Sequence, residues 1–503
     1  MVHFLYGLTI HSIQGYIFQT NKLKEIAGAS ELVEQICTGM FAKIIKTTAE
    51  GLKDDENAIR NAAGNVRYLF DDLETCKELV RTFPKKILEF APGIHISQAV
   101  VQIKETDVFQ TKSEELEGLL TAQRNNPIRP VDLGYIAINR SRRTGLPSVE
   151  RKKDNNEALI NDRATVCKRA CFERSKGTKN RVNTDFFGEV DFKDRMPDDF
   201  EAMVSSNPNY SWLAVIHADG NNMGQALQSL GNTNAETLKA FSKAVDLATK
   251  TAAQNAFKAT MSTFEIENTK IIPFRPIIVG GDDLTVICRA DLALKFTQAY
   301  LEHFKKETET NFKNTKLSTL ENGLTACAGI AFVKVSYPFH YAISLAEKLC
   351  SHAKTNAKAK PTVNGLTPSC LMFHKVQDSF VEEYSEIIKR ELTAKLSKCG
   401  FDFGPYYTIE TPTIDGLLKS ASELNGKEGN AIKSSLRQWL TDLHNNEDLA
   451  NQRMNRLLSV GNHKIIDKLG LRVSKGMFGT KSPVYDWLTV LSLNSNNDNN
   501  GND

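Results

Sequence analysis

Two adjacent aspartates lie at the tip of an apolar hairpin, in the stretch IIVGGDDLTVI of residues 277–287. A third aspartate, Asp219, follows an earlier apolar run in HADGNNMG. Three carboxylates that meet at one place repel one another, and a hard divalent cation with oxygen ligands removes that cost. Mg²⁺ or Mn²⁺ held in this way can carry a nucleoside triphosphate. The pattern therefore predicts a metal site made by Asp219, Asp282 and Asp283.

Glycines accompany these carboxylates. Gly280 and Gly281 precede the aspartate pair, and Gly220 follows Asp219. Such glycines allow a tight turn and let the backbone approach a phosphate closely. The alternative interpretation is a plain Gly-Asp turn, because glycine and aspartate are common turn residues. The second aspartate motif, at the matching strand end, favours the metal site.

The elements expected around the motifs follow a split βαβ pattern. Strands are expected at SWLAVIHA, FRPIIVG, LTVICR and LTACAGIAFV, with helices between and after them. In this pattern the first two strands are parallel, and the return strand of the hairpin lies between them, antiparallel to both. Asp219 should therefore lie beside Asp282 and Asp283, although more than 60 residues of sequence separate them.

The remainder of the chain divides by composition. The N-terminal part reads as alternating strands and helices, with strands at HFLYGLTI, NVRYLF and HISQAVVQI. A polar, basic stretch follows, then the segment with the aspartates, then a mainly helical segment and a low-complexity tail, NSNNDNNGND. The order of elements in the N-terminal part suggests a second ferredoxin-like unit.

Charge and cysteine usage narrow the class of protein. The 503 residues carry a net charge of +3, which excludes a strongly basic nucleic-acid coat but allows local patches. Nine scattered cysteines indicate reduced thiols, and no apolar run is long enough to span a bilayer, so we expect a cytoplasmic protein without a membrane contact. The clearest basic cluster is either a solvated loop or a phosphate-contacting surface; it comprises Arg140, Arg142, Arg143, Arg151, Lys152 and Lys153.

These motifs together resemble the second palm domain of the large (polymerase/cyclase) subunit of type III CRISPR effector complexes. The resemblance rests on GGDD between apolar strands, ADGNNMG upstream and AGIAFVKVSYPFHYAISLAEKLCSHAK downstream. IQGYIFQTNKLKEIAGASELV and AAGNVRYLF resemble the first palm of that family, and FGPYYTIETPTIDGLLKSASEL resembles the start of its C-terminal helical domain. Asn221 stands where the family often has a second aspartate, so it would be a neutral ligand at best.

The resemblance implies an α+β fold with two ferredoxin-like palm domains, an irregular insert between them and a C-terminal helical domain. The expected boundaries are a degenerate first palm at 1–130, the insert at 131–204, the GGDD palm at 205–360, the helical domain at 375–495 and a disordered tail at 496–503. Further nucleotide-binding positions are carried over from the family or proposed on the downstream helix: Ser30, Gly64, Asn65, Lys348 and Lys354.

Two family features are missing from this sequence. It has no His-Asp dipeptide and its first palm begins almost at Met1, so we expect no nuclease activity from this chain. The insert resembles a degenerate zinc module in which only Cys167 and Cys171 remain, and two thiols do not complete a structural zinc site. We therefore expect no zinc.

The function implied by the resemblance is metal-dependent nucleotidyl transfer from ATP, giving a cyclic oligoadenylate-type messenger in CRISPR or related antiphage defence. The expected partners are ATP and CRISPR effector subunits with guide RNA and target RNA. The alternatives are a SAM-AMP synthase, a cyclic dinucleotide synthase, or a non-catalytic scaffold subunit of an RNA-guided complex. The residue after GGD is Asp283, which argues against a GGDEF-type cyclase, and the intact carboxylates argue against a scaffold.

Overall fold

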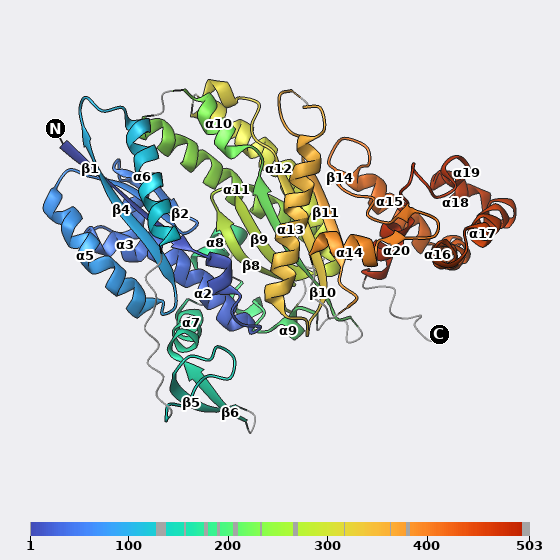
Figure 1. Ribbon diagram of the computed structural model, residues 1–503, viewed down its shortest axis with the longest axis horizontal. Helices are drawn as coiled ribbons and strands as arrows, with labels where there is room; N and C mark the ends of the chain where they lie inside the picture. Colours follow the sequence, from blue (N-terminus) through green and yellow to red (C-terminus); the bar gives the residue numbers. More distant parts are fainter. Residues whose placement is uncertain are drawn as a thin grey trace.

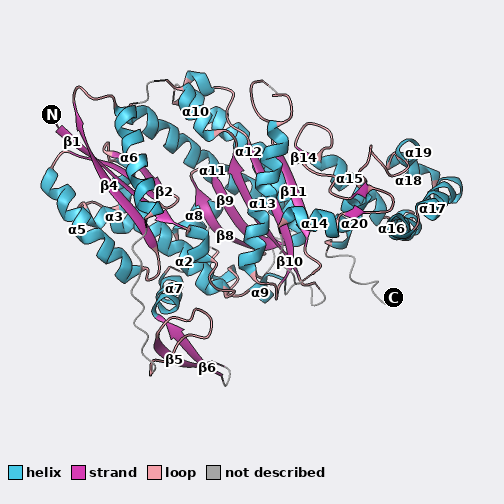
Figure 2. Cartoon of the chain, in the orientation of Figure 1, coloured by secondary structure: helices cyan, strands magenta, loops and turns pink. Residues whose placement is uncertain are grey.

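The structure is a computed structural model of the chain. Its two larger β-sheets lie side by side and are joined by helices, with a group of helices beyond the second sheet (Figures 1 and 2). The N-terminal sheet lies in the blue part of Figure 1, the second sheet in the green to orange part, and the last helices in the red part. The described residues are 2–126, 137–154, 157–175, 180–188, 192–204, 210–231, 234–264, 270–315, 317–362, 364–378 and 383–494.

The second sheet carries the aspartate motifs. Its strand order is β14-β11-β10-β7-β9-β8. β9 (Asp283–Arg289) lies between β7 (Trp212–Gly220) and β8 (Phe274–Gly280) and is antiparallel to both, as the split βαβ pattern predicted. The other strands of this sheet are β10 (Ala326–Lys334), β11 (Cys370–Lys375) and β14 (Tyr406–Tyr407).

Helices cover the second sheet on both sides, which explains why its strands are apolar almost throughout. α11 (Ala235–Phe264) and α12 (Ala290–Asn314) pack together on one face, and α13 (Phe339–Lys358) packs on the other (Figure 1). α13 lies very close to β10, since a Cβ added to Gly329 would come within 2.0 Å of the Ala346 carbonyl oxygen. A glycine at this position therefore lets α13 approach the strand next to β7.

The first sheet repeats the same topology, with strand order β2-β3-β1-β4. Its strands are β1 (Val2–His11), β2 (Ala58–Ala62), β3 (Asn65–Phe70) and β4 (His95–Lys104). The sequence did not indicate β2, which completes the β-α-β-β-α-β order of a ferredoxin-like unit. The helices of this unit include α1 (Ile13–Ile17), α2 (Leu23–Gln35), α3 (Phe41–Ile44), α4 (Ala49–Asp54), α5 (Leu73–Phe90) and α6 (Phe109–Asn125).

The described part of the insert contains regular structure that the sequence did not suggest. A hairpin of β5 (Ser148–Asp154) and β6 (Glu157–Asp162) leads into α7, α8 and α9, whose bounds are Arg163–Arg174, Arg181–Phe187 and Phe200–Val204. α7 packs tightly on α2 of the first unit, because a Cβ on Gly28 would lie 1.9 Å from the Lys168 carbonyl oxygen.

Buried charge also fastens the insert to the first unit. The side chain of Glu25 on α2 is 1% exposed and pairs with Arg143 at 2.9 Å and with Arg169 at 2.7 Å. Arg143 belongs to the basic cluster that the sequence marked; it forms an ion pair within the protein, and 32% of its side chain stays exposed. The side chains of Arg151, Lys152 and Lys153 lie outside the described residues.

The C-terminal part is helical, as predicted, apart from a short hairpin. The hairpin joins β12 (Thr393–Ala394) and β13 (Cys399–Gly400). In the second unit, one further helix, α10 (Met223–Ser229), directly follows β7. Across the described residues, no helix combines the length and apolarity needed to cross a membrane. The C-terminal helices are α14 (Tyr384–Arg390), α15 (Ile414–Asn425), α16 (Gly429–Asn445), α17 (Glu447–Val460), α18 (His463–Lys468), α19 (Leu471–Ser474) and α20 (Val484–Ser492).

Candidate nucleotide and metal site

The strand register brings the predicted aspartates together. Asp219, at the end of β7, is the direct antiparallel partner of Asp283, at the start of β9. Asp282 lies in the turn beside them, and a Cβ added to Gly220 would lie only 3.0 Å from the Cβ of Asp282. Gly220 therefore lets the turn approach β7, and the three carboxylates form one group, here called the aspartate cluster (Asp219, Asp282 and Asp283).

The turn between β8 and β9, here called the GGDD turn (Gly280–Asp283), needs glycine and is anchored by α11. Gly280 pairs with Asp283, and Gly281 has a φ of 60°, a left-handed conformation that glycine adopts without strain. The Gly281 N–H donates to Asp246 Oδ1 at 2.9 Å, and Thr249 Oγ1 donates to the Gly281 carbonyl oxygen at 2.6 Å. Both backbone groups of Gly281 are thus bonded, which fixes the direction of the aspartates that follow.

Burial and mutual repulsion make the aspartate cluster hard to ionise fully. Burial first, and then the charges of Asp282 and Asp219, raise the pKa of Asp283 to about 7. The pKa of Asp282 is also raised, first by burial and then by the charge of Asp219 and a hydrogen bond with it. Carboxyl groups in this state take up a divalent cation readily, because the cation removes the repulsion.

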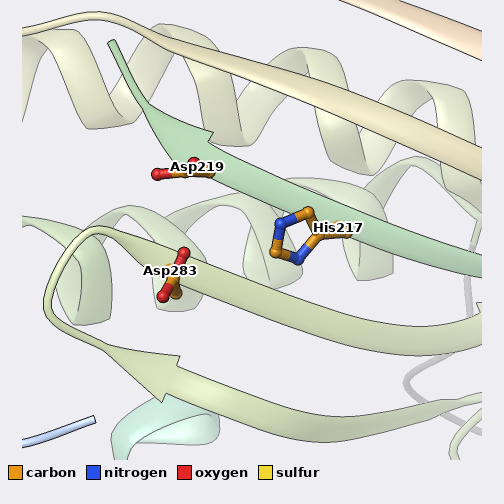
Figure 3. Close-up of side chains that lie close together, drawn as sticks. All are labelled: His217, Asp219 and Asp283. Atoms are coloured by element: carbon orange, nitrogen blue, oxygen red, sulfur yellow. The ribbon is translucent and has the colours of Figure 1, made fainter. Parts of the chain in front are cut away.

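A histidine that the sequence analysis missed adds a nitrogen to the cluster. His217, Asp219 and Asp283 each place one ligand atom so that these atoms lie within 4.8 Å of one another. Figure 3 shows the His217 ring on β7, two residues before Asp219 and on the same face of the sheet as the two carboxylates. Burial lowers the pKa of His217 to about 4, so the ring is neutral at pH 7. Its Nδ1 meets Thr285 Oγ1 at 3.2 Å, which leaves Nε2 for a further ligand.

The residues present fit a bound Mg²⁺ or Mn²⁺. Carboxylate oxygens suit both ions, and the imidazole of His217 adds a donor that favours a transition metal. A positive charge already stands at this place, because Lys354 Nζ donates to Asp219 Oδ2 at 2.5 Å and to the Gly220 carbonyl oxygen at 2.7 Å. Asp219, Asp283 and His217 would hold the ion, with Asp282 beside them.

The two lysines proposed for α13 differ in position. Lys354 reaches the aspartate cluster, whereas Lys348 Nζ pairs with Glu383 Oε1 at 2.8 Å, away from it. The two are six residues apart, which turns them by about 240° around the helix. Lys348 is therefore not brought to the site in this structure.

Asn221 is turned away from the carboxylates and into the protein. Its backbone N–H donates to the Thr325 carbonyl oxygen at 2.8 Å, and its Nδ2 donates to Thr325 Oγ1 at 3.0 Å. The side chain is 2% exposed, and its Oδ1 is buried without a hydrogen-bond partner in the described part of the chain. Its contacts tie the end of β7 to the strand that follows Thr325.

A cavity of about 470 Å³ lies between the two ferredoxin-like units and opens beside the aspartate cluster. Asp283 and Gly280 line it from the second unit, and the apolar wall comes from both units. The polar side chains of the lining are Ser12, Gln14, Ser30, Glu34, Asp283 and Glu347. None of the described lining residues is a lysine, arginine or histidine.

Of the residues carried over from the first palm, Ser30 contacts the second unit, whereas Gly64 and Asn65 shape a turn of the first unit. Ser30 lines the cavity, and its hydroxyl also donates to the Ile277 carbonyl oxygen on β8. Gly64 and Asn65 are not among the lining residues; they shape the turn that presents Ala63 to the cavity. Asn65 Nδ2 donates to the Ala63 carbonyl oxygen at 3.0 Å, and Gly64 has a φ of 73°.

A second turn and a cation from the first unit meet the GGDD turn. A Cβ added to Gly281 would lie 3.7 Å from the Ala63 Cβ and 3.5 Å from Arg60 Nη2. Neither Arg60 nor Asp246 was predicted, because each lies on an element that looks structural in the sequence. Arg60 lies in the short strand that was missed, and Asp246 lies inside a long helix.

Comparison with known proteins identifies the second unit. Residues 212–363 match the family model of the Cas10/Cmr2 second palm domain. A comparison with curated proteins finds no match. The chain is similar in fold to Csm1 solved in a Csm1–Csm4 cassette in complex with one ATP, with 14% identity and a TM-score of 0.50 over 98% of this chain and 70% of that chain.

Other solved structures are similar at the same low identity. The Csm1–Csm4 cassette in complex with cA4 shares 14% identity, with a TM-score of 0.47 over 97% of this chain and 69% of that chain. Csm1 in T. onnurineus shares 13% identity, with a TM-score of 0.49 over 97% of this chain and 68% of that chain. The chain therefore carries a Cas10/Cmr2 second palm domain within the fold of a Cas10-like large subunit of type III CRISPR effector complexes, the family that its motifs resemble.

Proposed function

We propose that the chain is a metal-dependent nucleotidyltransferase that polymerises ATP into a cyclic oligoadenylate-type messenger. The observation that carries the proposal is the direct pairing of Asp219 with Asp283 at the mouth of the cavity between the two palms. A polymerising site needs a donor and an acceptor nucleotide at once, with the reacting atoms about 3–3.5 Å apart. A cavity of about 470 Å³ that both palms line supports such a ternary arrangement.

In the proposed reaction a 3′-hydroxyl attacks the α-phosphate of a second ATP and pyrophosphate leaves. The divalent cation supplies a lowered pKa for the hydroxyl and charge neutralisation on the phosphates. The aspartate cluster holds that charge at the strand ends, and the anchored GGDD turn keeps Asp283 directed into the cavity. Lys354, released from Asp219 when the cation binds, is placed to neutralise phosphate charge.

A second candidate, adenylyl transfer to a cationic nucleoside such as S-adenosylmethionine, is favoured by the charge of the cavity. Glu34, Asp283 and Glu347 line it, and no basic side chain does so among the described lining residues. Such a lining attracts a sulfonium or ammonium group and repels a second triphosphate. In this candidate the donor ATP keeps its place at the aspartate cluster, and only the acceptor differs.

The chain is further proposed to work with companion effector subunits, guide RNA and target RNA. This follows the family, and a protein of the same fold was solved as a Csm1–Csm4 cassette with one ATP. RNA would then act as the activator of synthesis, so the assay must include it.

The test is to incubate the protein with labelled ATP and Mn²⁺, with and without RNA and S-adenosylmethionine, and to identify products by mass. Oligoadenylates from ATP alone support the first candidate, and an ATP-dependent adduct of S-adenosylmethionine supports the second. The Asp282→Ala, Asp283→Ala double variant should make neither product while keeping the wild-type circular dichroism spectrum. Normal synthesis by that variant would refute the site assignment.

A further inference from the structure

Arg60 is a cation that the first palm places beside the GGDD turn. Its Nη2 lies 3.5 Å from the position of a Cβ on Gly281, and its side chain is half-buried. Its charge opposes the raised pKa of Asp282 and of Asp283, so it lies within electrostatic reach of both. Within the described part of the chain, its guanidinium closes no ion pair and no hydrogen bond.

The local backbone directs Arg60 toward the second palm. The pairing of β2 with β3 is irregular between Ala58 and Arg60, and such a bulge changes where the following side chain points. Arg60 is the register partner of Arg67 on β3. Arg67 is fully engaged elsewhere, with Glu117 at 2.7 Å and the Leu8 carbonyl oxygen at 2.9 Å.

The contrast between these two arginines is informative. Arg67 has the partners that a structural, buried arginine needs, whereas Arg60 has none among the described residues and lies at the GGDD turn of the other unit. An arginine is bound most strongly by a group with two or more anionic oxygens, which its planar fork can contact together. The aspartate cluster is not the anionic group that Arg60 binds, because Lys354 already compensates the negative charge of the cluster and a bound cation would also compensate it.

We propose that Arg60 binds the terminal phosphates of the nucleoside triphosphate held at the GGDD turn, and so receives the pyrophosphate that leaves. This inference rests on the proposed nucleotidyl transfer and adds its phosphate-binding residue. As the 3′-oxygen bonds to the α-phosphorus, the hydroxyl proton passes to solvent water, the bond from that phosphorus to the bridging oxygen breaks, and the electron pair stays on pyrophosphate. Arg60 accepts no proton or electron; it stabilises the charge that develops there.

One consequence is that each palm must contribute to the same site. The second palm provides the aspartate cluster, and the first palm provides the cation opposite the GGDD turn. The donor triphosphate then lies between Arg60 and Lys354, neither of which lines the cavity, and Asp283 joins this region to the cavity. This separates a basic donor region from an acidic acceptor region.

The experiment compares Arg60→Gln and Arg60→Lys with a matched control, Arg81→Gln, which removes an exposed arginine on α5. Binding of inorganic pyrophosphate, ATP and adenosine is measured by calorimetry in Mn²⁺ on the full chain, and thermal melting checks the fold. Arg60→Gln should weaken pyrophosphate and ATP about tenfold or more, corresponding to about 1.4 kcal/mol. It should leave adenosine binding and the affinity for Mn²⁺ alone near wild type.

Arg60→Lys should recover part of the pyrophosphate affinity, because it keeps the charge without the fork, and Arg81→Gln should resemble wild type. Unchanged pyrophosphate binding in Arg60→Gln, or an equal loss for adenosine and pyrophosphate, would overturn the inference. Both readouts are equilibrium binding, so they stand apart from turnover. A wild-type protein that binds pyrophosphate through Arg60 yet makes no product would instead refute the proposed function.

Discussion

Replacing Asp283 by asparagine should stabilise the metal-free protein and abolish synthesis at the same time. Asp283 is a carboxyl group whose pKa burial, Asp282 and Asp219 raise from 3.8 to about 7. At pH 8 the folded protein must hold it ionised in an unfavourable place, whereas the unfolded chain ionises it freely. Asparagine has nearly the same shape and no charge, so this unfavourable term disappears.

The magnitude follows from the pKa values. A rise from 3.8 to about 7 is roughly 3 pKa units, and at about 1.36 kcal/mol per unit it destabilises the folded state by about 4 kcal/mol at most. The folded pKa lies above the unfolded one, so the penalty is absent below about pH 4, grows between pH 4 and 7, and is complete above pH 7. The pKa of about 7 already includes the charge of Lys354; relaxation of the surroundings reduces the penalty, and we expect about 2–4 kcal/mol at pH 8.

The assay is thermal unfolding of the full chain in EDTA at pH 8 and at pH 5. At about 2–4 °C per kcal/mol for a cooperative unit of this size, Asp283→Asn should melt at least about 4 °C above wild type at pH 8, and the difference should shrink at pH 5. Added Mn²⁺ should raise the melting temperature of wild type and leave the variant almost unchanged.

The control is Asp291→Asn in the same domain. Asp291 is paired with Arg289 at 2.8 Å and its side chain is 3% exposed, so this change should destabilise the protein. If Asp283→Asn melted at or below the wild-type temperature in EDTA at pH 8, Asp283 would not be a repelled carboxylate and the reasoning would be wrong.

Three further predictions concern the same site. Binding of Mn²⁺ should tighten as pH rises from 5 to 8, because Asp283, with a pKa of about 7, must lose its proton before it binds the ion. Calorimetry in two buffers should find about one proton released at pH 6 and almost none at pH 8.5. Asp246→Ala should lower synthesis and destabilise the protein by about 1.5–3 kcal/mol, because the Gly281 N–H loses its carboxylate acceptor. Asp246→Asn keeps an acceptor, so it should lose less activity in the product assay and less stability in thermal melting. Lys354→Met should lower the melting temperature in EDTA, because Asp219 loses its ion-pair partner. Added Mn²⁺ should restore most of the lost melting temperature. If the melting temperature stayed low in Mn²⁺, the role of Lys354 would be structural.

The local pattern of the chain was sufficient for the second palm and its carboxylates. The two strands around GGDD are apolar, the first ends in a glycine, and both lie in a split βαβ order, so the pairing of Asp219 with the hairpin follows from topology alone. Three strands of the first palm, at HFLYGLTI, NVRYLF and HISQAVVQI, were also predicted from the local pattern of the chain.

The first palm's β2 was missed because its residues, AIRNA, lack the alternation of a half-buried strand. That omission hid Arg60 as well, because a side chain in an unrecognised strand has no predicted neighbours. Lys348 shows the converse error. It lies on the correct helix, but the rotation of α13 on β10, fixed by the close approach at Gly329, turns Lys354 and not Lys348 toward Asp219.

The sequence by itself therefore determined the motif, the topology of the palm and the carboxylates at one sheet edge, because these depend on local periodicity and on chain order. Only the tertiary structure decided which other side chains join them. His217, Asp246 and Arg60 reach the site from a strand, a helix and another domain. Their positions depend on helix rotation, on a β-bulge and on the docking of two palms, and these are set by packing between segments far apart in the chain.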